Sequence, residues 1–248
     1  MIIIKSKREI DLMRVPCKIT AEILRELADY IKPGISTMDI NEYVESRITN
    51  HDMIPTFKGY GGFPAGACVS VNEEVIHGIP SVNRILEEGD IVSVDIGATY
   101  KGYNSDAART YPIGKISDED SKLIEVTKQS FFEGIKYAKE GYKIRDIGHA
   151  IQKYAESFGM GVVRDFTGHG TGSALHEDPI IPNYGKPGRG AMIEKNMTLA
   201  IEPMITLGTY EVKVLGNKWT TVTADGKKAA HYENTILVTD GEPEILTL

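Results

Sequence analysis

The feature that most constrains the fold is the stretch at residues 90–106, DIVSVDIGATYKGYNSD. It begins with an apolar, β-branched run that predicts a buried strand, and Asp95 lies where this run gives way to Gly97. Asp106 follows eleven residues later, after residues 100–104, whose composition predicts a tight turn. We therefore expect the chain to double back and to place Asp106 on a neighbouring antiparallel strand, facing Asp95.

Two facing carboxylates either share a proton or hold a cation, because like charges at short range do not both stay ionised without a compensating partner. The later chain favours a cation. It supplies His169 among glycines, Glu202 at a strand end, and Glu233 at the start of a β-branched run. Two Asp, two Glu and one His form an oxygen-rich set, which suits two divalent ions bridged by shared carboxylates.

Each of these residues, taken alone, has an ordinary explanation as a turn-former, a surface group or a satisfied core histidine. The set is more specific than its members. Asp95, Glu202 and Glu233 all lie at the edges of apolar runs, where burying an unpaired charge is costly. The sequence therefore predicts that a positive group balances them.

Composition predicts a globular protein without a nucleic-acid or membrane surface. The chain has 248 residues, is 41% hydrophobic and carries a net charge of −7, so no basic block is present to release counterions. No stretch reaches membrane-spanning length, and the short apolar start is followed at once by Lys5 and Lys7. Cys17 and Cys68 form no disulfide framework, so a reducing cytoplasm is expected.

Four helices are predicted from caps and apolar spacing. Ser6 and Glu9 form a capping box before a helix that reaches Ile31. The other three are expected from Ser36 or Thr37 to about residue 50, from Ser117 up to Gly141, and over about residues 145–158. Strands are expected at 68–71 and 75–77 with a turn between them, and over much of 161–248 with a hairpin turn at 224–226.

A shift of 107 residues reveals a weak internal repeat. It places Gly34 on Gly141 and Asp95 on Glu202, and it also aligns residues 39–40 with 146–147. We therefore expect one domain over residues 1–248, made of two similar halves at about 1–113 and 114–248. Each half would be a helix pair covering a curved antiparallel sheet, with the metal site between the halves.

Five separated motifs resemble the type I methionine aminopeptidases, a family with the pita-bread fold, which is an α+β fold. The motifs are VNEEVIHGIP (71–80), DIVSVDIGATYKGYNSDAARTY (90–111), TGHGTGSALHEDP (167–179), TLAIEPM (198–204) and HYENTI (231–236). Their order and spacing cover nearly the whole chain, and five matches together are specific where one would be weak. Gly97, where many relatives have Thr, and Asn234, where His is common, are minor departures beside the ligands.

The resemblance implies a role for each matching residue. It assigns Asp95 to one metal, Asp106 and Glu233 to both metals, and His169 and Glu202 to the other. It also makes Glu202, His176 and His77 the catalytic residues, with both histidines in contact with substrate. Without the resemblance, we would interpret these two histidines as solvated loop residues.

The chemistry expected of such a site is hydrolysis of an amide bond. Two divalent ions about 3.5–4 Å apart lower the pKa of a bridging water and give hydroxide near neutral pH. The resemblance identifies Glu202 as the group that takes the proton and passes it to the leaving amine. His176 would then hydrogen-bond the carbonyl oxygen as charge develops on it.

Specificity is expected from an apolar pocket near the metals. The aromatic residues of a glycine-rich loop either cover such a pocket or simply belong to the core. The resemblance favours a slot for a methionine side chain that Leu175 and the only tryptophan, Trp219, help to close. The predicted substrate-binding set is Phe57, Tyr60, Phe63, Cys68, Leu175 and Trp219, together with His77 and His176.

The resulting expectation is a monomeric, cytoplasmic metalloaminopeptidase that removes initiator methionine from nascent chains, with transient ribosome contact as a further partner. Its cofactors would be two ions of Co, Mn, Fe or Zn, among which the donor set does not select. Three rivals are weighed. A proline-directed peptidase of the same fold would carry an extra N-terminal domain, and only about 90 residues precede Asp95. A non-catalytic peptide-binding module would have lost ligands, and a phosphoesterase would need basic residues beyond Lys101 and Arg109 in the ligand motifs.

Overall fold

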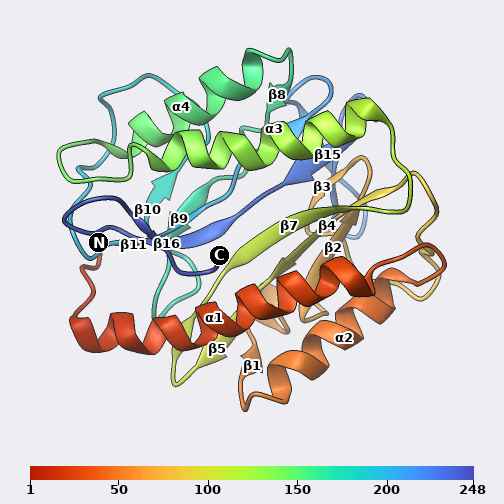
Figure 1. Ribbon diagram of the computed structural model, residues 1–248, viewed down its shortest axis with the longest axis horizontal. Coiled ribbons are helices and arrows are strands. Elements are labelled where there is room, and N and C mark those ends of the chain that lie inside the picture. Colours follow the sequence, from red (N-terminus) through yellow and green to blue (C-terminus); the bar gives the residue numbers. More distant parts are fainter.

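The structure is a computed structural model that describes residues 1–248. Two pairs of helices lie on either side of a set of short antiparallel strands (Figure 1). The first pair is α1 (Lys7–Tyr30) and α2 (Thr37–Thr49), and the second is α3 (Asp118–Ile135) and α4 (Ile144–Glu156). None of these helices combines the length and the apolar character that a bilayer-crossing helix needs.

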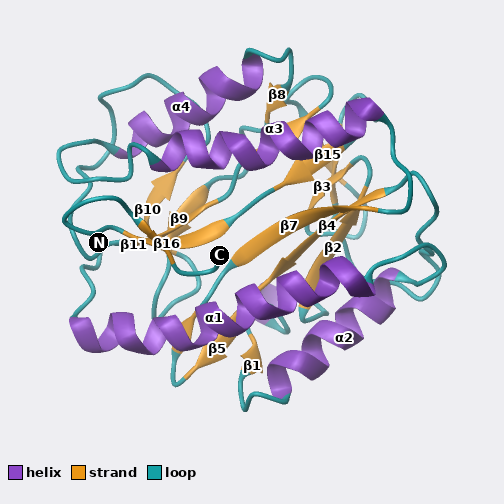
Figure 2. Ribbon diagram, viewed as in Figure 1, coloured by secondary structure: helices purple, strands orange, loops and turns teal.

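The strands form five small antiparallel groups between the helix pairs (Figure 2). The first half contains β1 (Ile54–Pro55), β2 (Ala67–Val71), β3 (Glu74–Ile76), β4 (Ile91–Ile96), β5 (Ala98–Tyr100), β6 (Tyr103–Asn104) and β7 (Ala107–Pro112). The second contains β8 (Gly161–Val162), β9 (Gly168–Gly170), β10 (Glu177–Ile181), β11 (Thr198–Ile201), β12 (Met204–Thr206), β13 (Val212–Val214), β14 (Thr221–Thr223), β15 (Ala229–His231), β16 (Asn234–Leu237) and β17 (Glu244–Ile245). The orders are β2-β4-β7, β1-β5-β6, β10-β9-β11-β16-β17, β15-β12-β8 and β13-β14-β3.

The helix caps follow the sequence prediction. At α1, Ser6 and Glu9 form the expected capping box, in which the Ser6 backbone donates to Glu9 at 2.8 Å. Ser36, rather than Thr37, caps α2 and pairs with Asp39 in the same way. These contacts satisfy backbone groups that the first helical turn leaves unpaired, which is why the local sequence is enough to place both helix starts.

The third helix is shorter than predicted. It begins after Ser117 as expected but ends at Ile135, and residues 136–141 continue as turns. Tyr137 donates to the carbonyl of Gly134 and Ala138 to that of Ile135, so the last turn tightens before Gly141 adopts a φ of +89°.

Two predicted hairpins are wrong in their pairing. The strand β3 follows β2 after a turn at Asn72, but it pairs with β14 from the other half, and β2 pairs with β4. The turn at 224–226 joins β14 to β15, and these two strands lie in different groups. In both places the turn residues predicted a reversal correctly, whereas partner choice depended on contacts distant in sequence.

The two halves share one architecture at the predicted offset. α2 and α4 both have 13 residues, and their starts at 37 and 144 differ by 107. The isolated bridge Ser36–Ile85 has its counterpart in Lys143–Met192 with the same shift. Each half also has its own apolar core, one of 19 residues beneath α1 and α2 and one of 14 beneath α3 and α4. The halves are therefore pseudo-symmetric.

The halves meet along a seam where Asp106 and Ala108 face residues 233–235. The backbone N–H of Glu233 donates to the Ala108 carbonyl at 3.0 Å. The Thr235 hydroxyl donates to the Asp106 carbonyl at 2.8 Å. This seam joins the two strand systems, and both of its sides carry acidic side chains that the sequence singled out.

Candidate active site

The first half contributes two carboxylates as predicted. β4 and β7 are antiparallel, with Asp95 opposite Ala108, and Asp106 immediately precedes β7. Between them, β5 and β6 form a small hairpin whose turn residues Lys101 and Gly102 have φ values of 48° and 82°. Both carboxylates therefore lie at the same end of this strand pair.

The second half contributes three more groups from adjacent strands. His169 lies on β9 opposite Ala200 of β11, and Glu202 directly follows β11. Glu233 directly precedes β16, which pairs with β11 on its other side. Neighbouring strands thus bring one imidazole and two carboxylates to the seam.

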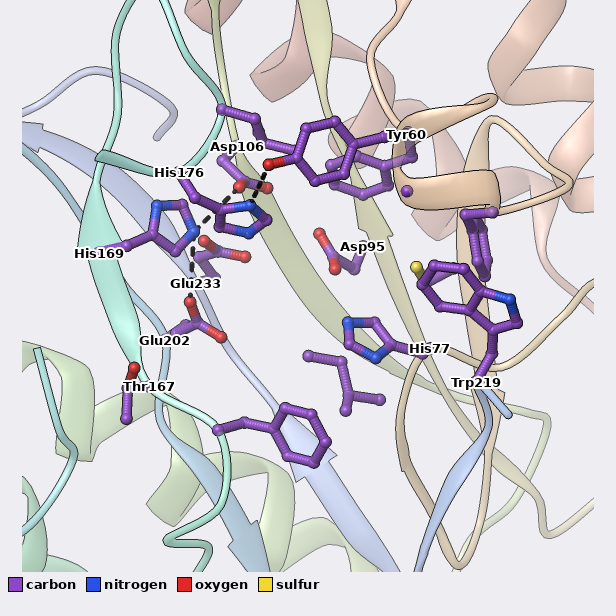
Figure 3. Close-up of a pocket in the computed structure, with 17 residues that line it drawn as sticks. Tyr60, His77, Asp95, Asp106, Thr167, His169, His176, Glu202, Trp219 and Glu233 are labelled. Atoms are coloured by element: carbon purple, nitrogen blue, oxygen red, sulfur yellow. Dashed lines mark hydrogen bonds and ion pairs between the residues drawn. The ribbon is translucent and has the colours of Figure 1, made fainter. Parts of the chain in front are cut away.

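The structure brings all five predicted ligands to one buried cluster at that seam (Figure 3). His169 Nε2 lies 3.5 Å from Asp106 Oδ2 and 3.6 Å from Glu202 Oε1. Ligand atoms of Asp106, His169 and Glu233 all lie within 4.8 Å of one another. Such spacing allows one cation to contact several of these groups at once.

The carboxylates lack a protein counter-charge. Burial, followed by the nearby Asp106, raises the pKa of Asp95, Glu202 and Glu233 well above the ordinary values. One oxygen each of Asp95, Asp106 and Glu233 is buried without a hydrogen-bond partner. No Lys or Arg side chain forms an ion pair with any of these groups. Because buried unpaired charge is costly, the donor set fits divalent cations.

A neighbouring backbone carbonyl orients the His169 imidazole for metal binding. His169 Nδ1 lies 2.8 Å from the carbonyl of Gly170, so Nδ1 carries the proton and donates to that carbonyl. The lone pair of Nε2 then faces the carboxylates. A hydrogen bond of this kind is the usual support for a metal-binding histidine.

Asn234 supports the backbone beside the cluster. Its Oδ1 accepts from Arg109 Nη2 at 2.7 Å, and the same guanidinium donates to the Glu233 carbonyl. The guanidinium also stacks on the Tyr232 ring, with 4.3 Å between Cζ and the ring centroid. Arg109 therefore holds the chain around Glu233 without neutralising its carboxylate.

A cavity of about 230 Å³ opens from the acidic cluster and is apolar on its far side. Phe63 packs edge-on against Trp219 with 5.2 Å between ring centroids. Every predicted substrate-binding residue lines this cavity: Phe57, Tyr60, Phe63, Cys68, His77, Leu175, His176 and Trp219. Most of the apolar members are buried, whereas Tyr60 is 45% exposed.

The two predicted substrate histidines stand between the cluster and the apolar wall. His77 has a φ of 59° and packs edge-on against Phe166 and Trp219. Burial, then the nearby His176, lowers the pKa of His77 to about 4. His176 lies 4.3 Å from His169, centroid to centroid, and burial lowers its pKa as well. Both rings are thus neutral near pH 7 and each has one N–H to donate.

Apart from Gly61 of the glycine-rich loop, sequence reasoning missed four residues of the site. Ile76, Phe166 and Thr167 line the cavity, and His231 lies behind it with Nε2 at 4.0 Å from Glu202 and 3.9 Å from Glu233. A signal for His231 existed, because residues two apart in extended chain face the same side and His231 precedes Glu233 by two. The other three lie in loops or at a strand end and are recognisable only in space.

Comparison with known proteins identifies the family of the chain. The family model of metallopeptidase family M24 matches residues 11–240. The chain therefore belongs to metallopeptidase family M24.

Within that family the chain is similar to methionine aminopeptidases. It is 58% identical to the methionine aminopeptidase of Clostridium acetobutylicum over 100% of this chain and 99% of that protein. It is 51% identical to methionine aminopeptidase 1 of Bacillus subtilis, again over 100% and 99%. The crystal structure of the Thermotoga maritima methionine aminopeptidase matches with a TM-score of 0.98 at 47% identity, covering 100% of this chain and 99% of that one.

More distant relatives share the fold. A prolidase from Pyrococcus furiosus matches with a TM-score of 0.78 at 22% identity, and the match covers 65% of that longer chain. Both groups of neighbours confirm the pita-bread fold with its two pseudo-symmetric halves.

Proposed function

We propose that this protein removes the N-terminal methionine from peptides and nascent proteins by hydrolysis. The observation that carries the proposal is one cavity that joins the buried acidic cluster to an apolar slot. The slot would hold an unbranched apolar side chain while the cluster lies beside the peptide bond that follows it. The names of the relatives with 51% and 58% identity support the same activity.

The five clustered residues would hold two divalent cations. Asp106 and Glu233 lie at the seam between the halves and would be shared by both ions, with Asp95 completing one site and His169 and Glu202 the other. When bound, such ions lower the pKa of water and polarise a carbonyl group. Cobalt, manganese, iron and zinc all suit this donor set.

The protein's own groups would bind, orient and move protons. Glu202, a buried carboxylate of the cluster, would accept a proton from the attacking water and deliver it to the leaving amine. His176 is neutral and would donate a hydrogen bond to the carbonyl oxygen as that oxygen becomes anionic. His77 lies between Trp219 and Phe166 and would orient the substrate at the junction of slot and cluster.

We also propose a single catalytic domain with halves at about 1–113 and 114–248, since the acidic cluster draws residues from both. The expected setting is the cytoplasm, which suits the two free, buried thiols of Cys17 and Cys68. Nascent chains as substrates, a monomeric state and transient ribosome contact belong to the same proposal.

A peptide series tests the function directly. The metal-loaded protein is given short peptides with Met, norleucine, Leu, Lys, Glu or Pro at the first residue followed by Ala, and a matched Met-Pro peptide. Met and norleucine peptides should be cleaved best, because both side chains are unbranched and apolar. Faster cleavage of an Xaa-Pro bond than of Met-Ala would instead identify a proline-directed peptidase, and no cleavage at any metal concentration would point to a binding module.

A further inference from the structure

Tyr60 stands apart from the other aromatic residues of the cavity. Phe57 and Phe63 are 7% and 3% exposed and fill the apolar wall, whereas Tyr60 is 45% exposed. The Tyr60 hydroxyl lies 2.7 Å from Nδ1 of His176, and both residues line the cavity (Figure 3). The two ring centroids are 5.2 Å apart. The hydroxyl therefore contacts a residue of the proposed active site instead of packing in the slot.

The backbone at Tyr60 is built around glycines that permit this orientation. Gly59, Gly61 and Gly62 have φ values of 84°, 56° and 91°, in the region that side-chain-bearing residues rarely adopt. Tyr60 itself is held in the turn by its backbone, which donates to Phe57 and accepts from Phe63. This tight turn points one aromatic ring towards His176 while the rings on either side remain buried.

The contact bears on which nitrogen of His176 carries the proton. A neutral imidazole has one N–H, and the hydrogen bond at one nitrogen decides the state of the other. A phenol hydroxyl is a good donor, so Nδ1 accepts from Tyr60 and the proton resides on Nε2. Nε2 makes no other hydrogen bond in the structure, and the ring lines the cavity. In the opposite tautomer, Nε2 would be an acceptor and would repel an oxygen that gains negative charge.

We infer that Tyr60 is a positioning residue, whose hydroxyl holds His176 in the tautomer that donates from Nε2 to the substrate carbonyl oxygen. This inference rests on the proposed function, in which His176 makes that hydrogen bond. Tyr60 would therefore act through His176 rather than through contact with the methionine side chain.

The first test compares three variants of the metal-loaded protein. Tyr60→Phe keeps the ring and removes the hydroxyl, and should lower kcat about tenfold with little change in KM, the usual scale for losing one hydrogen bond. Tyr103→Phe is a matched control, because its hydroxyl contacts only Glu9, outside the cavity, and should behave as wild type. Tyr60→Phe combined with His176→Ala should be no slower than His176→Ala alone.

The second test observes the imidazole itself. Nitrogen-15 spectra of the metal-free and zinc-loaded protein at pH 7.5 report the tautomer of each of the six histidines, and His176→Ala assigns the signal. Wild type should show His176 protonated on Nε2, and Tyr60→Phe should shift the signal towards a mixture of tautomers. Zinc is chosen because it is diamagnetic, and metal content should be equal in the two proteins.

The outcomes separate this inference from the proposed function. Native kinetics of Tyr60→Phe, in an enzyme that His176→Ala impairs, would overturn the inference and leave the proposed function standing. An equal loss of kcat when Tyr60→Phe is introduced into wild type and into His176→Ala would also overturn the inference, since Tyr60 would then act independently of the imidazole. Native activity of His176→Ala would instead refute the assigned role of His176.

Discussion

His169 Nε2 lies 3.5 Å from Asp106 Oδ2, so the one imidazole of the acidic cluster faces a carboxylate that comes from the other half of the chain. Neither half contains the cluster alone. The pseudo-twofold arrangement turns two incomplete sets of strand-end residues into one site, and the seam hydrogen bonds at Ala108 and Thr235 hold the sets in place.

Loss of either shared carboxylate should abolish metal uptake and activity together. Asp106→Ala and Glu233→Ala remove groups that we place between both ions, and no Lys or Arg side chain forms an ion pair with the remaining carboxylates. The fold should persist, because each half keeps its own apolar core. Metal titration by calorimetry and peptide hydrolysis are the measurements.

Glu211→Ala is the control for this pair, because Glu211 is an exposed carboxylate outside the cavity. It should retain two equivalents of metal and full activity. A Glu233→Ala protein that still bound two equivalents with unchanged affinity would contradict the ligand assignment.

Removing His176 should slow catalysis without weakening substrate binding. If the imidazole donates only to the developing oxyanion, His176→Ala should lower kcat by about 10²–10³-fold with a small change in KM. Metal content should stay the same, because His176 lies beside the cluster rather than within it. Steady-state kinetics paired with metal analysis distinguishes this role from that of a ligand, which would lose metal, and from a solvated loop residue, which would lose nothing.

His77 should make the metal-free protein sensitive to acid. Its pKa is about 4 in the folded state against 6.5 in the unfolded chain. Between pH 6.5 and about pH 4, the His77 imidazole therefore binds a proton in the unfolded chain but not in the folded chain. The free energy of unfolding is therefore not reduced by His77 above pH 6.5. It falls as the pH is lowered, by up to about 2 kcal/mol at pH 5.

Urea denaturation at pH 7 and pH 5 measures this effect. His77→Asn should lose less free energy of unfolding between the two pH values than wild type does, and Asn tolerates the φ of 59° found at this position. His51→Asn, which changes a histidine outside the cavity, should follow the wild-type slope. Identical slopes for all three proteins would exclude His77 as a source of acid sensitivity.

Gly97 should not tolerate a side chain. A Cβ at this position would lie 2.8 Å from the Ser105 carbonyl and 3.0 Å from the Phe57 ring. Gly97→Ala should therefore cost about 1–3 kcal/mol in the free energy of unfolding. It should also raise KM for Met peptides, because Phe57 forms part of the slot.

Gly216→Ala is the matched control, since a Cβ there meets nothing within 4 Å. It should leave both urea denaturation and KM unchanged. Wild-type stability and KM in Gly97→Ala would mean that Phe57 moves freely and that the slot is not shaped by this contact.

Sequence reasoning succeeded where the physics is local. The hydroxyl and carboxylate of a capping box lie three residues apart, so Ser6 with Glu9 revealed the start of α1. The start of α2 was predicted at Ser36 or Thr37, and the structure pairs Ser36 with Asp39. It was less successful at β3, where the turn predicted a return strand but β14 supplied the hydrogen-bonding partner. Partner choice depends on the packing of both halves, which no short window contains.

By itself, the sequence determined the helix starts, the repeat and the four carboxylates and one imidazole of the cluster as candidates, because caps, periodicity and charge beside apolar runs depend on neighbouring residues. Only the tertiary structure decided which groups face one another. It put His231 beside Glu202 and Glu233, buried Phe57 while exposing Tyr60, and set the Tyr60 hydroxyl on His176. These positions follow from the packing of the two halves against each other. Each long-range contact between the halves is weak, so only many of them together fix where these side chains lie.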